Sequence, residues 1–400
     1  MTSPMPEWRP SLIADDPRPV ALVFRSPVFN AAETFVAAQA AGLVRYQPLV
    51  LGLYCKGHVP DALDGRVLLA SRGQELSLKL FGAAGGPAAR LAPFRPRLIH
   101  AHFGPDGTLA LPLARRLGVP LVTSLRGYDV TRSPLRLLSS GRLSWMRHAL
   151  WRRTLMEQGT LFLAVSNALR EQAIAAGYPA ERTMTHYNGV DLTRFAPAGD
   201  DDGKTVLHVG RLVEKKGTAV LLHAFAEVRD KRPGASLVII GDGPLRGSLE
   251  RLAGQLGLTE AVRFIGFQSS AAVAEWMRRA AVVAVPSRRA EDGDAEGLPN
   301  VVVEAAASGR PVVATHHGGI GEAVEDGLTG FLVPEGAVAL LADRLGELLG
   351  SAELRRRFGA AARTMAEARF DRRRQMARLE TLYDDVVAEG RTSTSAIATR

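Results

Sequence analysis

Two glutamates eight residues apart carry the clearest chemistry in this sequence. Glu296 and Glu304 bracket the turn Gly-Leu-Pro-Asn, which leads into an apolar stretch that favours a helix starting at about Pro299. Carboxylates accept hydrogen bonds from hydroxyl groups, and backbone N–H groups at a helix start, here those of Leu298 and Asn300, favour an anion such as phosphate. The pattern is typical of a site for a nucleotide-linked sugar. The alternative interpretation is a helix-capping acid beside an unrelated surface glutamate.

A second segment combines a glycine turn with cations. An apolar run at 205–209 is followed by GRLVEKKG, in which Arg211 and Lys216 are five residues apart. A strand that ends in such a turn and continues into a helix brings N–H groups and cationic side chains together, and both bind diphosphate. The alternative is a loop with ordinary solvated charges.

A third turn, formed by Gly241-Asp242-Gly243-Pro244, follows the apolar run at 236–240 and opens another helix. A Gly-x-Gly turn also occurs in nicotinamide-dependent oxidoreductases, but their fingerprint continues as G-x-x-G, and position 246 is Arg here. A tight turn that serves only strand–helix packing is the other interpretation.

Parallel sheets are the elements that would position these loops, because short apolar runs alternate with helical patterns along the whole chain. Strands are predicted at 20–24, 49–54, 98–102, 120–125, 161–165 and 183–187, and again at 205–209, 236–240, 262–265, 281–285, 312–314 and 330–333. Helices are predicted at 32–42, 106–117, 217–230, 244–256, 271–279, 299–308, 320–325 and 335–349. The fold class is therefore α/β, with two Rossmann-like parallel-sheet domains that face a cleft.

Breaks in the pattern give the domain boundaries. The polar stretch 195–204, which contains proline and glycine, is typical of a linker. We therefore predict a first domain over 1–196 and a second over 197–370. Hinge motion about this linker is expected to close the cleft. Residues 371–389 continue a helical, strandless region, and the polar residues 390–400 are predicted to be a disordered tail.

Composition excludes several classes of protein. The chain has 400 residues, 46% of them hydrophobic and 23% charged, as in globular proteins and unlike disordered or fibrous chains. Its single cysteine cannot form an internal disulfide or a cysteine-based metal site. The first residues do not resemble a signal peptide, and no run of about 18 apolar residues predicts a membrane span. We expect a cytoplasmic protein.

The net charge of +9 lies entirely in the first half, where 23 Lys and Arg stand against 14 Asp and Glu. Part of it is the segment 132–153, which has six arginines, two tryptophans and no acid. Basic residues with interfacial aromatics favour an anionic membrane surface. A solvated helix face with two core tryptophans is the alternative. Binding of nucleic acid is not expected, because no recognised fold motif accompanies the charge.

The segment EGLPNVVVEAAASGRPVVATHHGGIGEAVEDGLTGFLVP at 296–334 resembles the donor-site signature of the retaining glycosyltransferases of family 4, which have the GT-B fold. GRLVEKKG at 210–217 and GDGP at 241–244 are similar to other donor-domain motifs of that family, in the same order. SPVFNAAETF at 26–35, HAHFG at 100–104, SLRGYD at 124–129, AVSN at 164–167 and YNGVD at 187–191 are similar to bacterial exopolysaccharide and colanic-acid-type glycosyltransferases.

The resemblance implies roles for the residues named above. Glu296 would hold hydroxyls of the donor sugar and Glu304 those of the ribose, while Arg211 and Lys216 would bind the diphosphate and stabilise the leaving group. The remaining donor-binding residues that it implies are Gly241, Gly243, Gly297, Leu298, Pro299 and Asn300, with the base near Gly266. The donor would be a nucleoside diphosphate sugar, with neither metal nor cofactor. The last helix would return to the first, acceptor-binding domain.

The acceptor side departs from the family pattern. Many relatives have His-Gly where this sequence has Arg126-Gly127, and a guanidinium cannot act as a general base. We hypothesise that Arg126 contacts a donor phosphate, an acidic sugar or an anionic acceptor; the alternative is a structural arginine. Strand alternation is interpreted as directing His100 and His102 to opposite faces, with His102 toward the cleft. Glu33 and Asp129 are the other predicted acceptor-side residues.

The resemblance thus implies transfer of a hexose-type residue, with retention, from a nucleoside diphosphate sugar to a glycan or lipid-linked glycan in cell-surface or exopolysaccharide biosynthesis. No residue is clearly placed as a covalent nucleophile, so the route to retention stays open. A sugar-nucleotide epimerase, a nicotinamide-dependent oxidoreductase and a non-catalytic nucleotide- or glycan-binding protein are the competing interpretations. A lipid-linked acceptor would place the protein at the inner face of the membrane.

Overall fold

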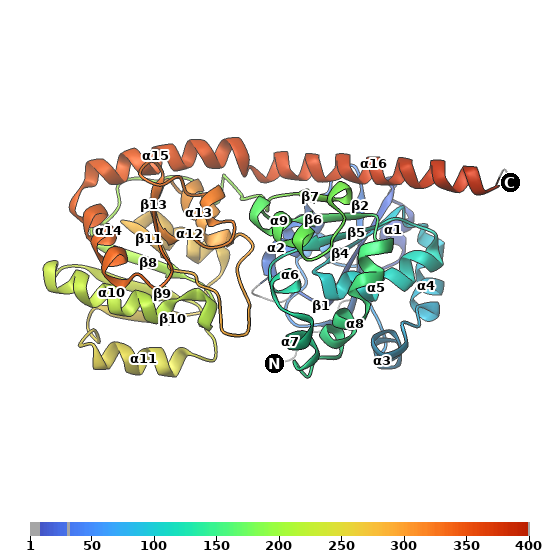
Figure 1. Cartoon of the computed structure of the whole chain (residues 1–400). Coiled ribbons are helices and arrows are strands. Elements are labelled where there is room, and N and C mark those ends of the chain that lie inside the picture. Colours follow the sequence, from blue (N-terminus) through green and yellow to red (C-terminus); the bar gives the residue numbers. More distant parts are fainter. Residues whose placement is uncertain (1–8, 30–32, 399–400) are drawn as a thin grey trace. The chain divides into compact units, whose positions relative to one another are not determined.

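The computed structural model describes residues 9–29 and 33–398, with side chains as far as residue 390. Within these residues the chain forms two compact units, each built on one parallel sheet (Figure 1). The first unit comprises the chain up to Val165, Leu169–His186 and the residues from Arg373 onward. The second unit comprises Ser166–Ala168 and Tyr187–Arg372.

The sheet of the first unit has seven described strands in the order β3-β2-β1-β4-β5-β6-β7, all parallel. They are β1 (Val20–Val28), β2 (Gln47–Cys55), β3 (Val67–Leu69), β4 (Leu98–His102), β5 (Leu121–Leu125), β6 (Leu161–Ala164) and β7 (Thr183–Thr185). The central strands β4, β5 and β6 are buried at every position, as expected for a sheet with helices on both faces. Sequence analysis missed β3 because three residues are too few to show a period.

The sheet of the second unit has six described strands in the order β10-β9-β8-β11-β12-β13, again parallel. They are β8 (Thr205–Val209), β9 (Ser236–Ile240), β10 (Val262–Gly266), β11 (Val282–Val285), β12 (Val312–Thr315) and β13 (Gly330–Val333). Each lies within a residue or two of its predicted position. The α/β fold class with two parallel-sheet units is thereby confirmed.

Helices connect the strands in both units. Those of the first unit are α1 (Ser11–Ala14), α2 (Thr34–Ala41), α3 (Arg72–Phe81), α4 (Gly85–Leu91), α5 (Gly104–Leu117), α6 (Tyr128–Thr131), α7 (Pro134–Leu138), α8 (Leu143–Gln158), α9 (Asn167–Ala175) and α16 (Arg372–Ala398). Those of the second unit are α10 (Thr218–Lys231), α11 (Arg246–Gln255), α12 (Ser270–Arg279), α13 (Asn300–Ala307), α14 (Val338–Gly350) and α15 (Ala352–Arg369). The helix predicted at 320–325 is only a 3₁₀ turn, Ile320–Glu322.

The strand order reverses once in each sheet. In the first sheet the chain moves outward from β1 to β3 and then returns to place β4 beside β1; in the second it returns to place β11 beside β8. The loops that follow the two strands at such a point diverge to opposite faces of the sheet and leave room for a ligand. The loops after β1 and β4, and those after β8 and β11, are therefore where functional residues are expected.

The boundary between the units lies at residue 187, ten residues before the predicted one at 197. Tyr187 stacks edge-on against Phe370, and Val190 pairs with Asp371 as an isolated bridge, so this segment folds with the second unit. The predicted linker 195–204 is packed into the second unit. Within it, the partly buried Asp201 accepts a hydrogen bond from Arg355 of α15 at 3.0 Å and also pairs with Arg310.

Helix α16 packs along the first sheet although it follows the second unit in sequence (Figure 1). The Tyr383 hydroxyl lies 2.6 Å from Nδ1 of His100, and Glu380 accepts hydrogen bonds from the N–H groups of Val44 and Arg45, each at 2.7 Å.

Helix α16 continues to Ala398, whereas the sequence predicted a disordered tail from residue 390. Extending a formed helix fixes only one residue per hydrogen bond, and no proline interrupts it here. Residues 399–400 lie outside the described chain.

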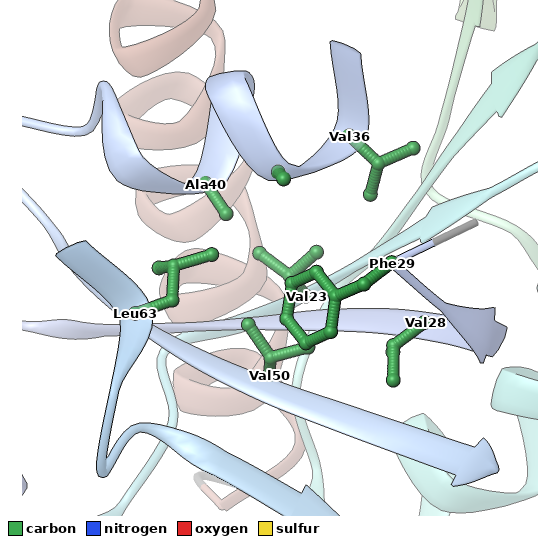
Figure 2. A pocket seen from close by; sticks show the side chains of 8 residues that line it. Val23, Val28, Phe29, Val36, Ala40, Val50 and Leu63 are labelled. Carbon is green, nitrogen blue, oxygen red and sulfur yellow. The ribbon is translucent and has the colours of Figure 1, made fainter. Parts of the chain in front are cut away.

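A small pocket in the first unit lies between β1, β2 and α2 (Figure 2). Its lining is apolar and includes Val23, Phe29, Val36, Val50 and Leu63. Such a lining offers no hydrogen bond to a sugar or a phosphate. The candidate functional site therefore lies in the loops at the strand ends and not in this pocket.

Candidate functional site

The loops after β8 and β11 bring cations and carboxylates together in the second unit. The ammonium group of Lys216 lies 3.0 Å from Oε1 of Glu296. Lys215 lies 3.5 Å from the same oxygen and 3.0 Å from Oδ1 of Asp294. Sequence analysis predicted Lys216 and Glu296 but missed Lys215 and Asp294, although Lys215 adjoins Lys216 in the same cationic turn.

This ion cluster fixes the protonation of Glu296. Burial by itself raises the pKa of its carboxyl, but the charges of Lys216 and Lys215 outweigh burial and lower the pKa to about 2. In the same way the carboxylates of Glu296 and Asp294 raise the pKa of Lys215 against the effect of burial. Glu296 is therefore a carboxylate at neutral pH and can accept hydrogen bonds from hydroxyl groups.

Two residues that sequence analysis missed hold Glu296 in place. The N–H of Glu296 donates to Nε2 of His317 at 3.0 Å, and Nδ1 of His317 lies 2.6 Å from Oε1 of Glu335. Since Nε2 accepts, the hydrogen-bond network assigns the ring proton to Nδ1, which donates to Glu335. Glu335 is itself held by the N–H of Arg289 at 2.9 Å. The double histidine at 316–317 was the available signal, but only the fold shows which of the two is used.

Glycines let the neighbouring turn close over the Glu296 loop. The carbonyl of Gly297 accepts hydrogen bonds from the N–H of Gly319 at 2.7 Å and from the Ser166 hydroxyl at 3.0 Å. A Cβ on Gly318, whose φ is +55°, would lie 2.2 Å from the Glu296 carbonyl oxygen. The segment Gly318-Gly319 thus has no room for side chains, and Gly297 and Leu298 are buried beneath it.

Glu304 occupies the fifth position of α13 and is partly exposed. Burial raises the pKa of its carboxyl to about 7, against the opposing charges of Arg194 and Lys216. The two glutamates that the sequence paired by spacing therefore differ in protonation. Glu296 is ionised, whereas Glu304 titrates near neutral pH.

Helix α13 begins at Asn300, so Pro299 is the residue before the helix rather than its first residue. The Pro299 carbonyl accepts the N–H of Val302 at 3.1 Å. The N–H groups of Asn300 and Val301 lie ahead of the helical hydrogen-bond pattern and give this end a partial positive charge. The Asn300 side chain accepts a hydrogen bond from Asn188 at 2.9 Å.

Gly241 and Gly243 serve close packing between the loops after β8 and β9. A Cβ at Gly241, whose φ is +132°, would lie 1.9 Å from the carbonyl oxygen of Gly210, and one at Gly243 would lie 2.4 Å from that of Leu212. The N–H of Gly241 donates to the carbonyl of Gly266 at 2.8 Å. These contacts hold together the loops after β8, β9 and β10, and Arg211 in the first of these loops is exposed.

In the first unit the loops after β1 and β4 form a second charged cluster. Arg25, in the second half of β1, pairs with Glu33 at 2.8 Å and with Asp106 of α5 at 2.5 Å. Its guanidinium also lies over the Phe103 ring, 4.4 Å from the centroid. Burial lowers the pKa of Arg25, but the two carboxylates more than compensate and raise it. Sequence analysis identified Glu33 but missed Arg25 and Asp106, which lie one residue before the motif at 26–35 and two residues after the motif at 100–104.

Arg126 and His102 are neighbours in this cluster. Nη2 of Arg126 lies 3.1 Å from Nδ1 of His102, and its guanidinium lies 4.3 Å from the centroid of the Phe35 ring. Burial lowers the pKa of Arg126 to about 10, against the charges of Asp129 and Glu33. Burial and nearby positive charge hold the pKa of His102 well below its usual value, so the imidazole is neutral. Since Nδ1 accepts from Arg126, Nε2 carries the proton.

The prediction that His100 and His102 point to opposite faces is wrong. Their rings stack with centroids 4.5 Å apart, because residues two apart on a strand share a face. Both side chains are buried. His100 lies between Tyr383 and the Ser124 hydroxyl, at 2.6 and 2.8 Å, and is structural.

Asp129 has a structural role. Its carboxylate accepts hydrogen bonds from the N–H groups of Gly104, Arg126 and Gly127, at 2.9, 3.0 and 2.8 Å. The side chain is 1% exposed. It fixes the Arg126 loop against the start of α5 and thereby positions Arg126, rather than presenting its carboxylate to a ligand.

Comparison with known families identifies what these two units are. The sequence profile "Glycosyltransferase Family 4" matches residues 33–194, and the profile "Glycosyl transferases group 1" matches residues 190–365. Together they span residues 33–365, which include the loops after β4, β8 and β11. The chain belongs to the family 4 glycosyltransferases, as the resemblance in its sequence implied.

Over the aligned segments, curated relatives are about one-third identical to this chain. WcaL of Escherichia coli K12, named as a colanic acid biosynthesis glycosyltransferase, is 34% identical over 68% of this chain and 68% of its own. The amylovoran biosynthesis glycosyltransferase AmsK of Erwinia amylovora is 32% identical, but the match spans 62% of AmsK. A GDP-mannose-dependent phosphatidylinositol monomannoside mannosyltransferase of Mycolicibacterium smegmatis is 33% identical over 74% of this chain and 80% of its own.

Solved structures share the fold. HepE of Anabaena in complex with UDP-glucose superposes with a TM-score of 0.74 at 24% identity, over 94% of this chain and 99% of that one. Sucrose-phosphate synthase of Thermosynechococcus elongatus superposes with a TM-score of 0.75 at 20% identity, over 93% and 100% of the two chains. The GT-B fold is therefore confirmed.

The described residues contain no group of three or more His, Cys, Asp or Glu side chains arranged to hold a metal ion. No helix in the same part of the chain combines the length and the hydropathy needed to cross a bilayer.

Proposed function

We propose that this glycosyltransferase moves a hexose-type sugar from a nucleoside diphosphate sugar to a glycan or lipid-linked glycan, with retention, in cell-surface or exopolysaccharide biosynthesis. The observation that supports it best is the Lys216–Glu296 pair at 3.0 Å, with Glu304 close enough for Lys216 to affect its pKa. Cation, carboxylate and helix start are the groups that a diphosphate and a polyhydroxylated sugar require. The names of the colanic acid and amylovoran relatives support the biological role.

In this proposal Lys216 and Arg211 neutralise the charge that develops on the leaving diphosphate, without a metal. The bond between the anomeric carbon and the diphosphate oxygen breaks, and its electrons go to the diphosphate. An acceptor hydroxyl oxygen forms the new bond on the same face, and its proton passes to the leaving diphosphate. Glu296, ionised in the free protein, accepts hydrogen bonds from the donor sugar, and Glu304 accepts them from the ribose.

The acceptor side of the proposal centres on Arg126. Because Arg126 is charged at neutral pH and held by Asp129, it suits an anionic group of the acceptor or donor. Replacing it by His or Ala is expected to change substrate choice or turnover. Unchanged kinetics would mean that Arg126 is structural.

Thermal denaturation with UDP, GDP, ADP and NAD in turn tests the donor site. A ligand present at 100 times its Kd stabilises the folded state by about 2.7 kcal/mol, which raises the melting temperature measurably. We expect stabilisation by one nucleoside diphosphate, lost in Glu304→Ala and unaffected by EDTA. The solved relatives include a UDP-glucose complex and the curated ones a GDP-mannose enzyme, so the panel also identifies the base.

The competing functions give different results in the same experiments. Stabilisation by NAD alone would contradict a transferase. Conversion of the donor sugar without any acceptor would indicate an epimerase. Nucleotide binding without transfer to any glycan fraction would indicate a binding protein. The configuration of the new linkage, read by NMR from its anomeric coupling, tests retention.

A further inference from the structure

Large apolar side chains are exposed on one part of the first unit. They belong to α3, α7 and α8, which gather at the lower edge of that unit in Figure 1. We define the apolar patch by six of these residues: Leu76, Leu80, Phe81, Leu135, Leu150 and Trp151. Phe81 is 79% exposed, Leu135 77% and Leu150 68%. Scattered single apolar residues are ordinary on a protein surface, whereas a contiguous exposed apolar patch marks an interaction site.

Helix α8 joins the patch, since both α3 and α7 pack against it. Buried Arg147 of α8 donates to the carbonyl of Leu80 at 3.4 Å, and its guanidinium lies 5.0 Å from the centroid of the Trp151 ring. Leu80 and Trp151 are therefore both neighbours of one side chain. Phe81 follows Leu80 at the end of α3, and Leu150 precedes Trp151. On α7, Leu137 is fully buried and anchors the helix, while Leu135 faces away from the core.

Cations accompany the patch. Residues 72–81 and 130–158 contain eight Lys and Arg but only two acids, Glu75 and Glu157, which pair with Lys79 and Arg153. Arg136, Arg142 and Arg153 are exposed. The guanidinium groups of Arg132 and Arg142 lie 4.8 and 4.6 Å from the centroid of the Trp145 ring. Trp145 thus lies between arginines. It is neither a core tryptophan nor a membrane-facing one, the two arrangements that the sequence suggested.

We infer that α3, α7 and α8 form a docking surface for an anionic lipid bilayer. Exposed Leu, Phe and Trp side chains enter the boundary between headgroups and acyl chains, and the surrounding arginines bind lipid phosphates. A second copy of this chain is a poorer partner, because a symmetric contact would bring two strongly cationic faces together. The inference rests on the proposed function in one respect: docking would bring the enzyme to a lipid-linked acceptor.

Vesicle flotation tests the inference without donor or acceptor. The intact protein is mixed with vesicles of phosphatidylcholine containing 30% phosphatidylglycerol, or of phosphatidylcholine alone. We expect binding to the anionic vesicles, weakened by salt. Phe81→Ser/Leu135→Ser/Leu150→Ser should reduce the partition coefficient at least ten-fold. The matched control, Val44→Ser/Leu328→Ser, changes apolar residues that are 71% and 50% exposed elsewhere and should bind like the unmodified protein.

The charges are tested separately. Arg136→Gln/Arg153→Gln should lower binding about five-fold for each cation removed. Arg251→Gln/Arg356→Gln, which removes two exposed arginines of the second unit, should leave it unchanged. Stabilisation of each variant by nucleotide is measured in parallel, so that failure of docking is distinguished from failure of the donor site.

Three outcomes would overturn the inference. These are no binding of the unmodified protein to anionic vesicles, equal binding by patch and control variants, and equal binding to neutral vesicles. Concentration-dependent dimerisation that the patch variant abolishes, without vesicle binding, would instead assign the surface to self-association.

Discussion

At the scale of single residues, Glu296 and Glu304 show how the surroundings of two identical side chains give their carboxyl groups different pKa values. Both are largely removed from water, yet only Glu296 is surrounded by ammonium groups within 3.5 Å. Its charge is stabilised, so it can accept hydrogen bonds at any physiological pH. Glu304 has only more distant cations to offset burial. Its protonation therefore responds to pH in the range in which the enzyme is expected to work.

This difference predicts a pH dependence of stability. The pKa of Glu304 is about 7 in the folded protein against 4.5 for the unfolded group. Between these values the folded state keeps a proton that the unfolded state loses, so the free energy of unfolding falls as pH rises through this window, by about 3 kcal/mol. Above pH 7 the loss is complete.

The measurement compares melting temperatures of the unmodified protein and Glu304→Gln between pH 4.5 and 8. The variant cannot titrate at this position, so its melting temperature should fall less with rising pH. Exposed Glu353→Gln serves as the control and should follow the unmodified protein. Parallel curves for all three would show that Glu304 titrates normally.

A second prediction concerns the residue that positions Glu296. His317→Ala removes the acceptor of the Glu296 N–H and leaves the polar groups of Glu296 and Glu335 without their partner. Such a loss costs about 1–3 kcal/mol, so nucleotide affinity should fall roughly ten-fold or more. His317→Gln should recover part of it, since its carbonyl oxygen can accept the same hydrogen bond.

Titration calorimetry with UDP, GDP and ADP measures the effect of these variants. His316→Ala is the matched control, because His316 is adjacent and exposed. Equal affinities for the His317→Ala and His316→Ala proteins would contradict a positioning role.

At the scale of elements, the second unit depends on loops that touch through glycine. Gly241→Ala would place a methyl group 1.9 Å from the Gly210 carbonyl oxygen at a φ of +132°, so the loops after β8 and β9 must move apart. We expect destabilisation by more than 2 kcal/mol and loss of nucleotide binding.

The control for this prediction is Gly247→Ala in α11, where an added Cβ meets nothing within 4 Å. Alanine favours a helix interior over glycine, so this variant should be as stable as the unmodified protein or more stable by about 0.5–1 kcal/mol. Calorimetric melting curves of the Gly241→Ala and Gly247→Ala proteins, recorded with and without nucleotide, measure both the stability and the nucleotide binding of each variant. Normal stability of Gly241→Ala would show that the loops have more room than these contacts indicate.

At the scale of the whole molecule, the chain returns to its first unit through α16. Leu379 and Tyr383 are buried against the first sheet, and the Tyr46 hydroxyl bonds Asp384 at 2.8 Å. The first unit thus lacks part of its core until the second unit has been synthesised. A chain that ends at residue 371 should lose the melting transition of the first unit or shift it far downward, because apolar surface becomes exposed.

A chain that ends at residue 390 keeps these contacts and is the control. Differential scanning calorimetry should show its first unit melting as in the full chain. An unchanged first transition in the shorter chain would mean that α16 adds little to the core. Nucleotide binding by the second unit provides an internal check that both truncated proteins have folded there.

The amino-acid sequence by itself determined the fold class, nearly all of the strands and the donor motifs. Those features are local: a buried parallel strand is a short apolar run, and a loop that binds diphosphate needs glycine, cations and a helix start within a few residues. Glu296, Lys216 and the glycines of the 241–243 turn could be predicted for that reason. β3 was missed because it is too short to show a pattern.

Only the tertiary structure decided which distant residues complete each site. Arg25 and Asp106 are 81 residues apart, and Glu296 depends on His317 and Glu335. Their contacts arise because parallel strands bring separate loops to one edge of a sheet, which no local pattern records. Burial and packing, which the chain acquires only when it folds, likewise decide three further features. These are the protonation of Glu304, the stacking of His100 on His102, and the hydrogen bonds from backbone N–H groups to Asp129.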